Sequence, residues 1–88
     1  MAVVTLRGQL RTLAGGRPDH EVPGATVGEL LHALEAAQPA LRGWILDERG
    51  RVRRHINVFV GADAAADDTA VGEDDRVNVL PAISGGSR

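Results

Sequence analysis

The sequence predicts a small α+β domain in which one helix packs on one face of a four- to five-stranded sheet. With 88 residues, the chain has room for one modest hydrophobic core. It contains one strongly amphipathic helical segment, residues 27–37, and several β-branched segments near both ends. Because a sheet with an apolar face needs a covering layer, a helix lying across that face buries the apolar side of both elements.

The N-terminal part predicts a β-hairpin. Residues 3–7 are rich in β-branched side chains, and Val4 and Leu6 share one face of the expected strand. Residues 10–13 still read as extended chain. Residues 14–19 have turn chemistry, because glycine permits positive φ and proline restricts φ. Residues 20–22 then return as the second strand.

The helical segment carries clear start and stop signals. Thr26 and Glu29 form a capping box, in which the Thr26 hydroxyl accepts from an early helix amide and Glu29 reaches back to the Thr26 backbone. Pro39 ends the helix, because the residue before a proline avoids the α region. The apolar stripe has helical spacing and consists of Val27, Leu30, Leu31 and Leu34.

The second half of the chain predicts two longer strands and mostly irregular connections. A short helical turn is indicated by the spacing of Leu41, Trp44 and Ile45, and we expect it to pack on the core. Residues 47–50 read as a tight turn. Residues 51–60 contain a strand with Ile56, Val58 and Val60 on one face. Residues 61–75 read as loops with one weak edge strand.

The last strand spans residues 76–80, with Val77 and Val79 on one face and Asn78 and Leu80 on the other. Pro81 stops it, because proline cannot donate a hydrogen bond to a sheet. The expected domain covers residues 1–82, followed by a flexible tail, residues 83–88.

Composition excludes several classes of function. The chain has no cysteine, so thiol nucleophiles, thiolate metal sites and disulfides are absent. All ten basic residues are arginine, so no lysine forms a Schiff base. The net charge of −2 and two aromatic residues argue against nucleic-acid binding. No apolar run is long enough to span a membrane, and the first ten residues resemble no signal peptide, so we expect a cytoplasmic protein.

No side-chain constellation has the spacing of a catalytic or metal site. The three histidines, His20, His32 and His55, match no ligand pattern, and we expect them at the surface or beside a site. Both serines lie near the C-terminus without a local acid–base partner, which argues against a catalytic triad.

Glycine and charged residues also have structural explanations. Residues 24–28 lack the spacing and the lysine of a phosphate-binding loop, so capping and a turn explain their glycines. The acidic residues read as a solvated edge that suits a basic partner rather than a cation site; they are Asp67, Asp68, Glu73, Asp74 and Asp75. The arginines of residues 49–54 are interpreted as a strand edge protected against pairing rather than an RNA contact. They are Arg49, Arg51, Arg53 and Arg54.

The segment after the last expected strand has a different character. Its side chains become small and it contains a Gly-Gly pair, Gly85-Gly86. A frayed terminus is the simple explanation. A functional one is that two residues without Cβ atoms can thread a narrow enzyme channel and bring a main-chain carboxylate to ATP. Attack of a Gly86 carboxylate on the α-phosphate would give an acyl-adenylate, which sulfide or a thiol can capture.

The chain resembles the ubiquitin-like sulfur carrier proteins of the MoaD/ThiS family, which have a β-grasp fold with a mixed sheet. The resemblance covers residues 1–86 and is strongest over RVRRHINVFVG, residues 51–61, and GEDDRVNVLPAISGG, residues 72–86. Within the family, the sequence is most similar to the actinobacterial-type carriers for cysteine or thio-metabolite biosynthesis.

The resemblance implies a carrier without catalytic side chains of its own. The glycine matching Gly86 is adenylated by an E1-like enzyme and converted to a thiocarboxylate, which delivers sulfur to a biosynthetic enzyme. The chain binds no cofactor itself, whereas the activating enzyme uses ATP and a sulfur donor. The tail residues Ile83, Ser84, Gly85 and Gly86 thread the partner active sites. Phe59, Leu80 and Pro81 are implied docking residues, and core packing is an equal explanation for Leu80.

In active carriers of this family the second glycine is the last residue, whereas here Ser87-Arg88 follows Gly86. The resemblance implies trimming by a JAMM-type metallopeptidase; a cloning remnant is the alternative. Two other functions remain open, namely a protein modifier conjugated through Gly86 to lysines and a noncovalent β-grasp binding module. The acceptor also remains open among molybdopterin, thiazole, cysteine, a thiosugar and other thio-metabolites.

Overall fold

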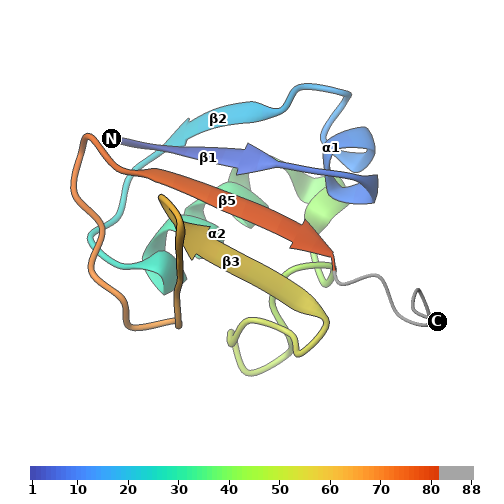
Figure 1. The fold of residues 1–88 in the computed structure, drawn as a ribbon. Coiled ribbons are helices and arrows are strands. Elements are labelled where there is room, and N and C mark those ends of the chain that lie inside the picture. The colour runs from blue at the N-terminus through green and yellow to red at the C-terminus, as the bar shows by residue number, and fades with distance from the viewer. Residues whose placement is uncertain (82–88) are drawn as a thin grey trace, which may run out of the picture.

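The computed structural model describes residues 1–81 and contains a five-stranded mixed sheet with one long helix on one face (Figure 1). The sheet order is β2-β1-β5-β3-β4, in which β1 and β5 are parallel and the other pairs are antiparallel. The elements are β1 (Ala2–Leu6), α1 (Gln9–Leu13), β2 (Asp19–Val22), α2 (Val27–Ala37), η1 (Pro39–Leu41), β3 (Ile56–Val60), β4 (Asp63–Ala64) and β5 (Arg76–Pro81). This arrangement confirms the predicted α+β class and the β-grasp fold.

Strands β1 and β5 form the centre of the sheet and bury their inner faces completely. Val4 and Leu6 of β1 are opposite Val77 and Val79 of β5, and all four are fully buried. Parallel neighbours need a crossover connection, and α2 lies within the long segment that joins β1 to β5 (Figure 1). The last strand in the chain is therefore paired on both sides as far as Val79, and its last two residues pair with β3 alone.

Helix α2 has the predicted bounds and nearly the predicted cap. The Glu29 amide donates to the Thr26 hydroxyl (3.2 Å), as the capping box requires. The Glu29 carboxylate, however, accepts from the Ala25 amide (2.8 Å), one residue before the expected partner. The helix ends at Ala37 because Gln38, before Pro39, has left the α region.

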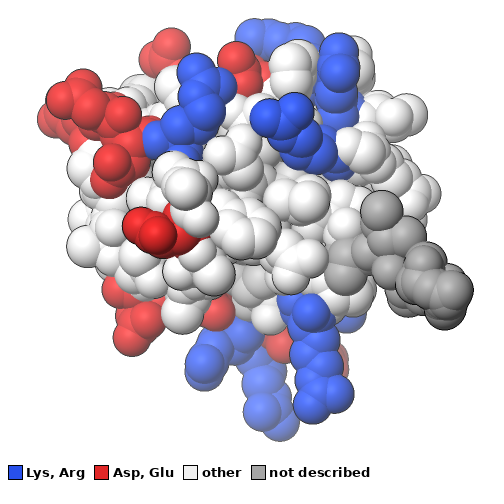
Figure 2. All heavy atoms as spheres, in the orientation of Figure 1, with Lys and Arg blue, Asp and Glu red and all other residues white. Residues whose placement is uncertain are grey.

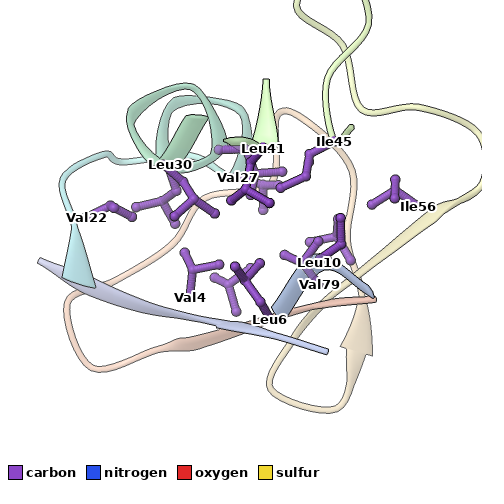
Figure 3. Close-up of a cluster of buried hydrophobic side chains, with 14 of the residues drawn as sticks. Val4, Leu6, Leu10, Val22, Val27, Leu30, Leu41, Ile45, Ile56 and Val79 are labelled. Atoms are coloured by element: carbon purple, nitrogen blue, oxygen red, sulfur yellow. The ribbon is translucent and has the colours of Figure 1, made fainter. Parts of the chain in front are cut away.

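The core lies between α2 and the inner face of the sheet (Figure 3). Leu30 of α2 is fully buried and faces Val4 and Leu6 of β1, while Leu41 and Ile45 close one end. In the part of the chain that the model describes, no helix is long and apolar enough to cross a membrane.

The expectation of extended chain over residues 10–13 is wrong, because Gln9–Leu13 forms α1. The Gly8 carbonyl accepts from the amides of Arg11 and Thr12, so the turn starts at a glycine with a φ of +60°. Leu10 is buried and Leu13 half-buried, a helical spacing that lets both reach the core from one short helix. The connection between the two hairpin strands is consequently longer than a simple turn.

Trp44 also differs from the expectation, since 40% of its surface is exposed. Leu41 and Ile45 are fully buried, as predicted. The helical spacing is interrupted between them, because η1 ends at Leu41 and Gly43 has a φ of +83°. The change of direction at Gly43 turns Trp44 away from the core.

The arginine-rich segment is a loop rather than a strand edge. The Asp47 carboxylate accepts from the backbone amides of Arg49 (2.9 Å) and Arg51 (3.0 Å), and the Arg53 carbonyl accepts from Ile56 (3.0 Å). These turns occupy residues 47–55, and β3 begins only at Ile56. The predicted tight turn, the weak edge strand β4 and the last strand are confirmed, although β5 includes Pro81.

Replacing Glu35 with alanine is expected to lower the free energy of unfolding by about 1–3 kcal/mol, the cost of leaving buried donors unpaired. One Glu35 carboxylate oxygen accepts from the Ile45 amide (3.2 Å) and the Leu46 amide (3.0 Å), thereby holding the segment after η1 against α2. Urea denaturation measures the change. Glu35→Gln keeps an acceptor oxygen, so its free energy of unfolding should fall by less than half as much as that of Glu35→Ala. Equal decreases in the two variants would contradict this role.

Candidate functional site at the end of β5

The candidate site is the C-terminal end of β5 and the segment that follows it. The four predicted threading residues lie outside the described residues; they are Ile83, Ser84, Gly85 and Gly86. The described part ends with Leu80 and Pro81 on a central strand. Leu80 is opposite Asn57 of β3, and Pro81 is opposite Ile56. The following segment therefore starts from residues that are paired with β3, at the end of a strand that β1 also holds as far as Val79.

The register places the predicted docking residues on different faces of the sheet. Phe59 and Leu80 lie on the open face, opposite α2, because they alternate with the buried Val58 and Val79. Phe59 is opposite Asn78, so Phe59 and Leu80 are diagonal neighbours on adjacent strands. Both are half-buried, and Figure 2 shows this open face in the orientation of Figure 1.

Pro81 faces the helix side instead. It is opposite Ile56, whose side chain belongs to the core, and its ring lies beside Gly8. A Cβ atom built on Gly8 would be 3.5 Å from the Pro81 ring, which is an ordinary van der Waals contact distance. The Pro81 ring therefore packs closely beside Gly8. Pro81 therefore packs at the base of the site, whereas Phe59 and Leu80 are available on the open face.

A polar network crosses the open face near the other end of β5. The Arg76 guanidinium donates to Thr5 Oγ1 (2.8 Å) and Asp19 Oδ1 (3.0 Å), and the Thr5 hydroxyl donates to Asp19 (2.8 Å). These residues come from β5, β1 and β2. The hydrogen bond from Thr5, followed by that from Arg76, lowers the pKa of the Asp19 carboxyl below its ordinary value. The network has no local sequence signal, because it depends on which strands are neighbours in the sheet.

The network should make part of the stability depend on pH at the acidic end. A carboxyl with a lowered folded-state pKa stabilises the fold above its unfolded value of about 3.9, and this contribution is lost as the pH falls through the folded-state pKa. We expect the melting temperature of wild type to exceed that of Asp19→Asn at pH 7 and the difference to shrink below about pH 4. Thermal denaturation from pH 2 to pH 7 checks this; a constant difference would contradict it.

The histidines occupy three different environments. His20 is buried on the inner face of β2, opposite Val4, so the expectation of a surface position is wrong for this residue. Its Nε2 lies 2.9 Å from the Arg17 carbonyl, and alternation with Val22 explains its inward orientation. His32 is exposed on α2, with Nε2 3.2 Å from the Gly50 carbonyl. His55 is exposed in the turn before β3.

The acidic residues and the surface hollows present no reactive centre. Within residues 1–81, no group of three His, Cys, Asp or Glu side chains could hold a metal ion. Asp67 accepts from the Val52 amide (3.0 Å) and lines a shallow hollow of about 500 Å³ with Thr26 and Arg51. A second hollow, of about 390 Å³, lies between the N-terminus of β1 and the loop before β5.

The ThiS family model matches residues 4–86, which includes both glycines of the candidate site. Small archaeal modifier protein 1 of Haloferax volcanii is 39% identical over 79 residues, which cover 88% of this chain and 91% of the relative. The sulfur carrier protein CysO of Mycobacterium tuberculosis is 29% identical over 83 residues, covering 88% and 89%.

The solved structures agree with this similarity. A chain in the crystal structure of the Amycolatopsis orientalis BexX/CysO complex superposes with a TM-score of 0.84 and 29% identity, covering 98% of this chain and all of the other. Similarity thus extends over the whole domain.

Proposed function

Because the chain belongs to the ThiS family of ubiquitin-like sulfur carriers, we propose that it carries sulfur as a thiocarboxylate on Gly86. The observation that carries this proposal is the family match, which ends at Gly86. The CysO relative, named as a sulfur carrier, gives independent support. The reacting group belongs to the main chain, so the protein is a co-substrate and not an enzyme.

The proposed chemistry takes place on partner enzymes. A Gly86 carboxylate oxygen attacks the α-phosphorus of ATP on an E1-like enzyme, and pyrophosphate leaves. Sulfide then attacks the acyl-adenylate carbonyl, AMP leaves and the thiocarboxylate forms directly. Alternatively, the terminal sulfur of an enzyme persulfide attacks, AMP leaves, and a thiol cleaves the S–S bond of the resulting acyl disulfide, which releases the thiocarboxylate and leaves a disulfide. The chain binds no cofactor in this scheme, since ATP and the sulfur donor belong to the activating enzyme. A sulfur-accepting biosynthetic enzyme uses the product, and we expect the cycle in the cytoplasm.

The segment Ile83, Ser84, Gly85, Gly86 is proposed to enter the partner active sites. Glycine has no Cβ atom, so a narrow channel admits the last two residues and their carbonyl approaches ATP closely. The pairing of β5 supports this function, because the strand is held by β1 as far as Val79 and by β3 as far as Pro81, which fixes the point from which the segment starts. Residues after Gly86 must be removed to free its carboxylate, and we propose a JAMM-type peptidase for that step.

The open face of the sheet is the proposed docking surface for the partners. Phe59 and Leu80 are half-buried side chains on this face, close to the end of β5. Aromatic and aliphatic side chains of this kind contribute most to binding when a partner covers them completely. Pro81 contributes indirectly, by packing beside Gly8 and fixing the start of the segment.

Mass spectrometry of the intact protein tests the sulfur carrier function. The chain ending at Gly86 is incubated with ATP, sulfide and the adenylating enzyme of the same organism. We expect the mass to rise by the difference between one sulfur and one oxygen atom, with the change located on Gly86. A reaction without ATP is the control. Absence of this product with every adenylating enzyme of the organism would refute the proposal.

The acceptor is best sought first in cysteine biosynthesis. The CysO relative points in that direction, whereas molybdopterin, thiazole and other thio-metabolites are further members of the same class of acceptors. Supplying the thiocarboxylate to candidate acceptor enzymes and following release of the unmodified chain would identify the acceptor.

Conjugation to proteins is a second candidate function, favoured by the 39% identity to small archaeal modifier protein 1. Both functions begin with adenylation of Gly86 and differ only in the nucleophile, which would here be a lysine amine of a target protein. Peptide mapping of cell proteins distinguishes them: a modifier leaves a Gly-Gly remnant on target lysines, whereas a pure carrier leaves none.

A further inference from the structure

The two ends of the sheet differ in charge. Residues 61–75 contain six carboxylates and no basic residue, while residues 49–55 contain four arginines and no carboxylate. In Figure 2, acidic side chains gather on the left of the open face, and arginines occupy the upper and lower parts nearer the side where β5 ends. The charges are separated along the sequence, and the fold places the two segments at opposite ends of β3, because one precedes Ile56 and the other follows Val60.

The acidic end is where β5 begins. Glu73, Asp74 and Asp75 immediately precede Arg76, the first residue of β5, and all three are exposed. Asp63 of β4 is also exposed and follows the end of β3. The one arginine at this end, Arg76, is already paired with Asp19. A strand of six residues spans about 17 Å between its first and last Cα atoms, so these carboxylates are far from Pro81.

The end of β5 lies between two exposed arginines from different elements. Arg7 follows β1, and its amide donates to the Val79 carbonyl (3.1 Å). Arg54 belongs to the turn that leads into Ile56, which is opposite Pro81. Within residues 1–81, the only ion pair is Arg76–Asp19, so neither Arg7 nor Arg54 has a carboxylate partner there.

The neighbouring arginines of the 47–55 loop lie close to carboxylates of that region, those of Asp47 and Asp67. Asp47 accepts from the backbone of Arg49 and Arg51, and Arg53 and Arg49 contribute to the lowered pKa of its carboxyl. Arg51 lines the hollow that contains Asp67. Arg54 has no ion-pair partner among residues 1–81. Arg7 acts at longer range on Asp19, a carboxylate that is already paired with Arg76. These two arginines therefore flank the end of β5 without a carboxylate of their own.

We propose that Arg7 and Arg54 form a basic collar that recognises an acidic protein surface around the channel entrance of the activating enzyme. This inference rests on the proposed function for the identity of the partner. Opposite charges on two proteins accelerate their encounter and orient them toward each other. Charges at the rim of a docking face act mainly on the association rate. The acidic end of the sheet would be repelled by the same surface. Together the two ends would orient the carrier with the end of β5 toward the channel.

Association kinetics with the purified adenylating enzyme of the same organism test the collar. The full chain is used, because docking does not need a free Gly86 carboxylate and is measured apart from sulfur transfer. The double variant Arg7→Glu/Arg54→Glu is compared with Arg49→Glu/Arg51→Glu, which makes the same change of charge on exposed residues of the 47–55 loop. Circular dichroism confirms that both variants are folded.

We expect Arg7→Glu/Arg54→Glu to lower the association rate about tenfold at low salt, and the control variant to lower it less than about twofold. Near 1 M salt, where the screening length is about 3 Å, the difference should vanish. Equal effects of both variants, a faster rate in the collar variant, an effect independent of salt, or no binding of wild type would overturn the collar. If the expected kinetics occur but no thiocarboxylate forms, the proposed function fails and the collar stands.

Discussion

A chain that ends at Gly85 is expected to form no measurable thiocarboxylate, a loss of at least about a thousandfold relative to the chain that ends at Gly86. Each extended residue spans about 3.3–3.6 Å, so the terminal carboxylate would fall short of the ATP α-phosphate by roughly that distance. A displacement of about 1 Å already costs on the order of a hundredfold in rate. The rate is measured from intact masses during incubation with ATP, sulfide and the adenylating enzyme.

The matched control is a chain that keeps both glycines but lacks Ser84. It has the same terminal residue as the active chain and the same length as the inactive one. If reach decides the outcome, both shortened chains are inactive and both still bind the enzyme, since residues 1–81 are intact. Activity of the chain ending at Gly85 would refute the assignment of Gly86. If the chain without Ser84 is active and the chain ending at Gly85 is not, the terminal Gly-Gly pair matters and the length of the segment does not.

Local signals predicted the regular elements well. The bounds of α2 follow from the Thr26 cap, the leucine stripe and Pro39, all of which act within one or two helical turns. Strands β3 and β5 follow from alternation over five or six residues. The fold class then follows because one helix and one sheet have few ways of burying their apolar faces.

The errors have both distant and local causes. Leu10 joins the core because α1 packs beside η1 and β5, contacts that no short window of sequence contains. His20 alternates with Val22 in β2, and its position opposite Val4 makes that face the buried one. Trp44 has the spacing of a buried residue, but the positive φ of the adjacent Gly43 redirects the chain.

The chemistry proposed for the candidate site stays a prediction, and the geometry around it was only partly predictable. Gly85-Gly86 stands out in the sequence because a main-chain carboxylate needs no reactive side chain. The separation of Leu80 from Pro81 and the network of Thr5, Asp19 and Arg76 required the register of β5 with β1 and β3. Neighbouring strands joined by a long connection cannot be inferred from alternation alone.

The opposite faces of β5 predict opposite results for two adjacent substitutions. Val79→Asp places a carboxylate on the fully buried face, opposite Leu6 and Val58, with no basic partner. Desolvation of an unpaired charge costs several kcal/mol, a large part of the roughly 5–15 kcal/mol that stabilise a domain. We expect this variant to be unfolded at 25 °C, as measured by circular dichroism and urea denaturation.

Leu80→Asp makes a comparable change of size and charge one residue later, on the open face. Leu80 is half-buried and lies diagonal to Phe59, so the carboxylate keeps access to water and the variant should stay folded. Its affinity for the adenylating enzyme should fall by at least about thirtyfold, the effect of losing a central apolar contact worth about 2 kcal/mol. Calorimetric titration measures the affinity. A folded Val79→Asp variant, or a Leu80→Asp variant that binds like wild type, would contradict the division of β5 into a core face and a docking face.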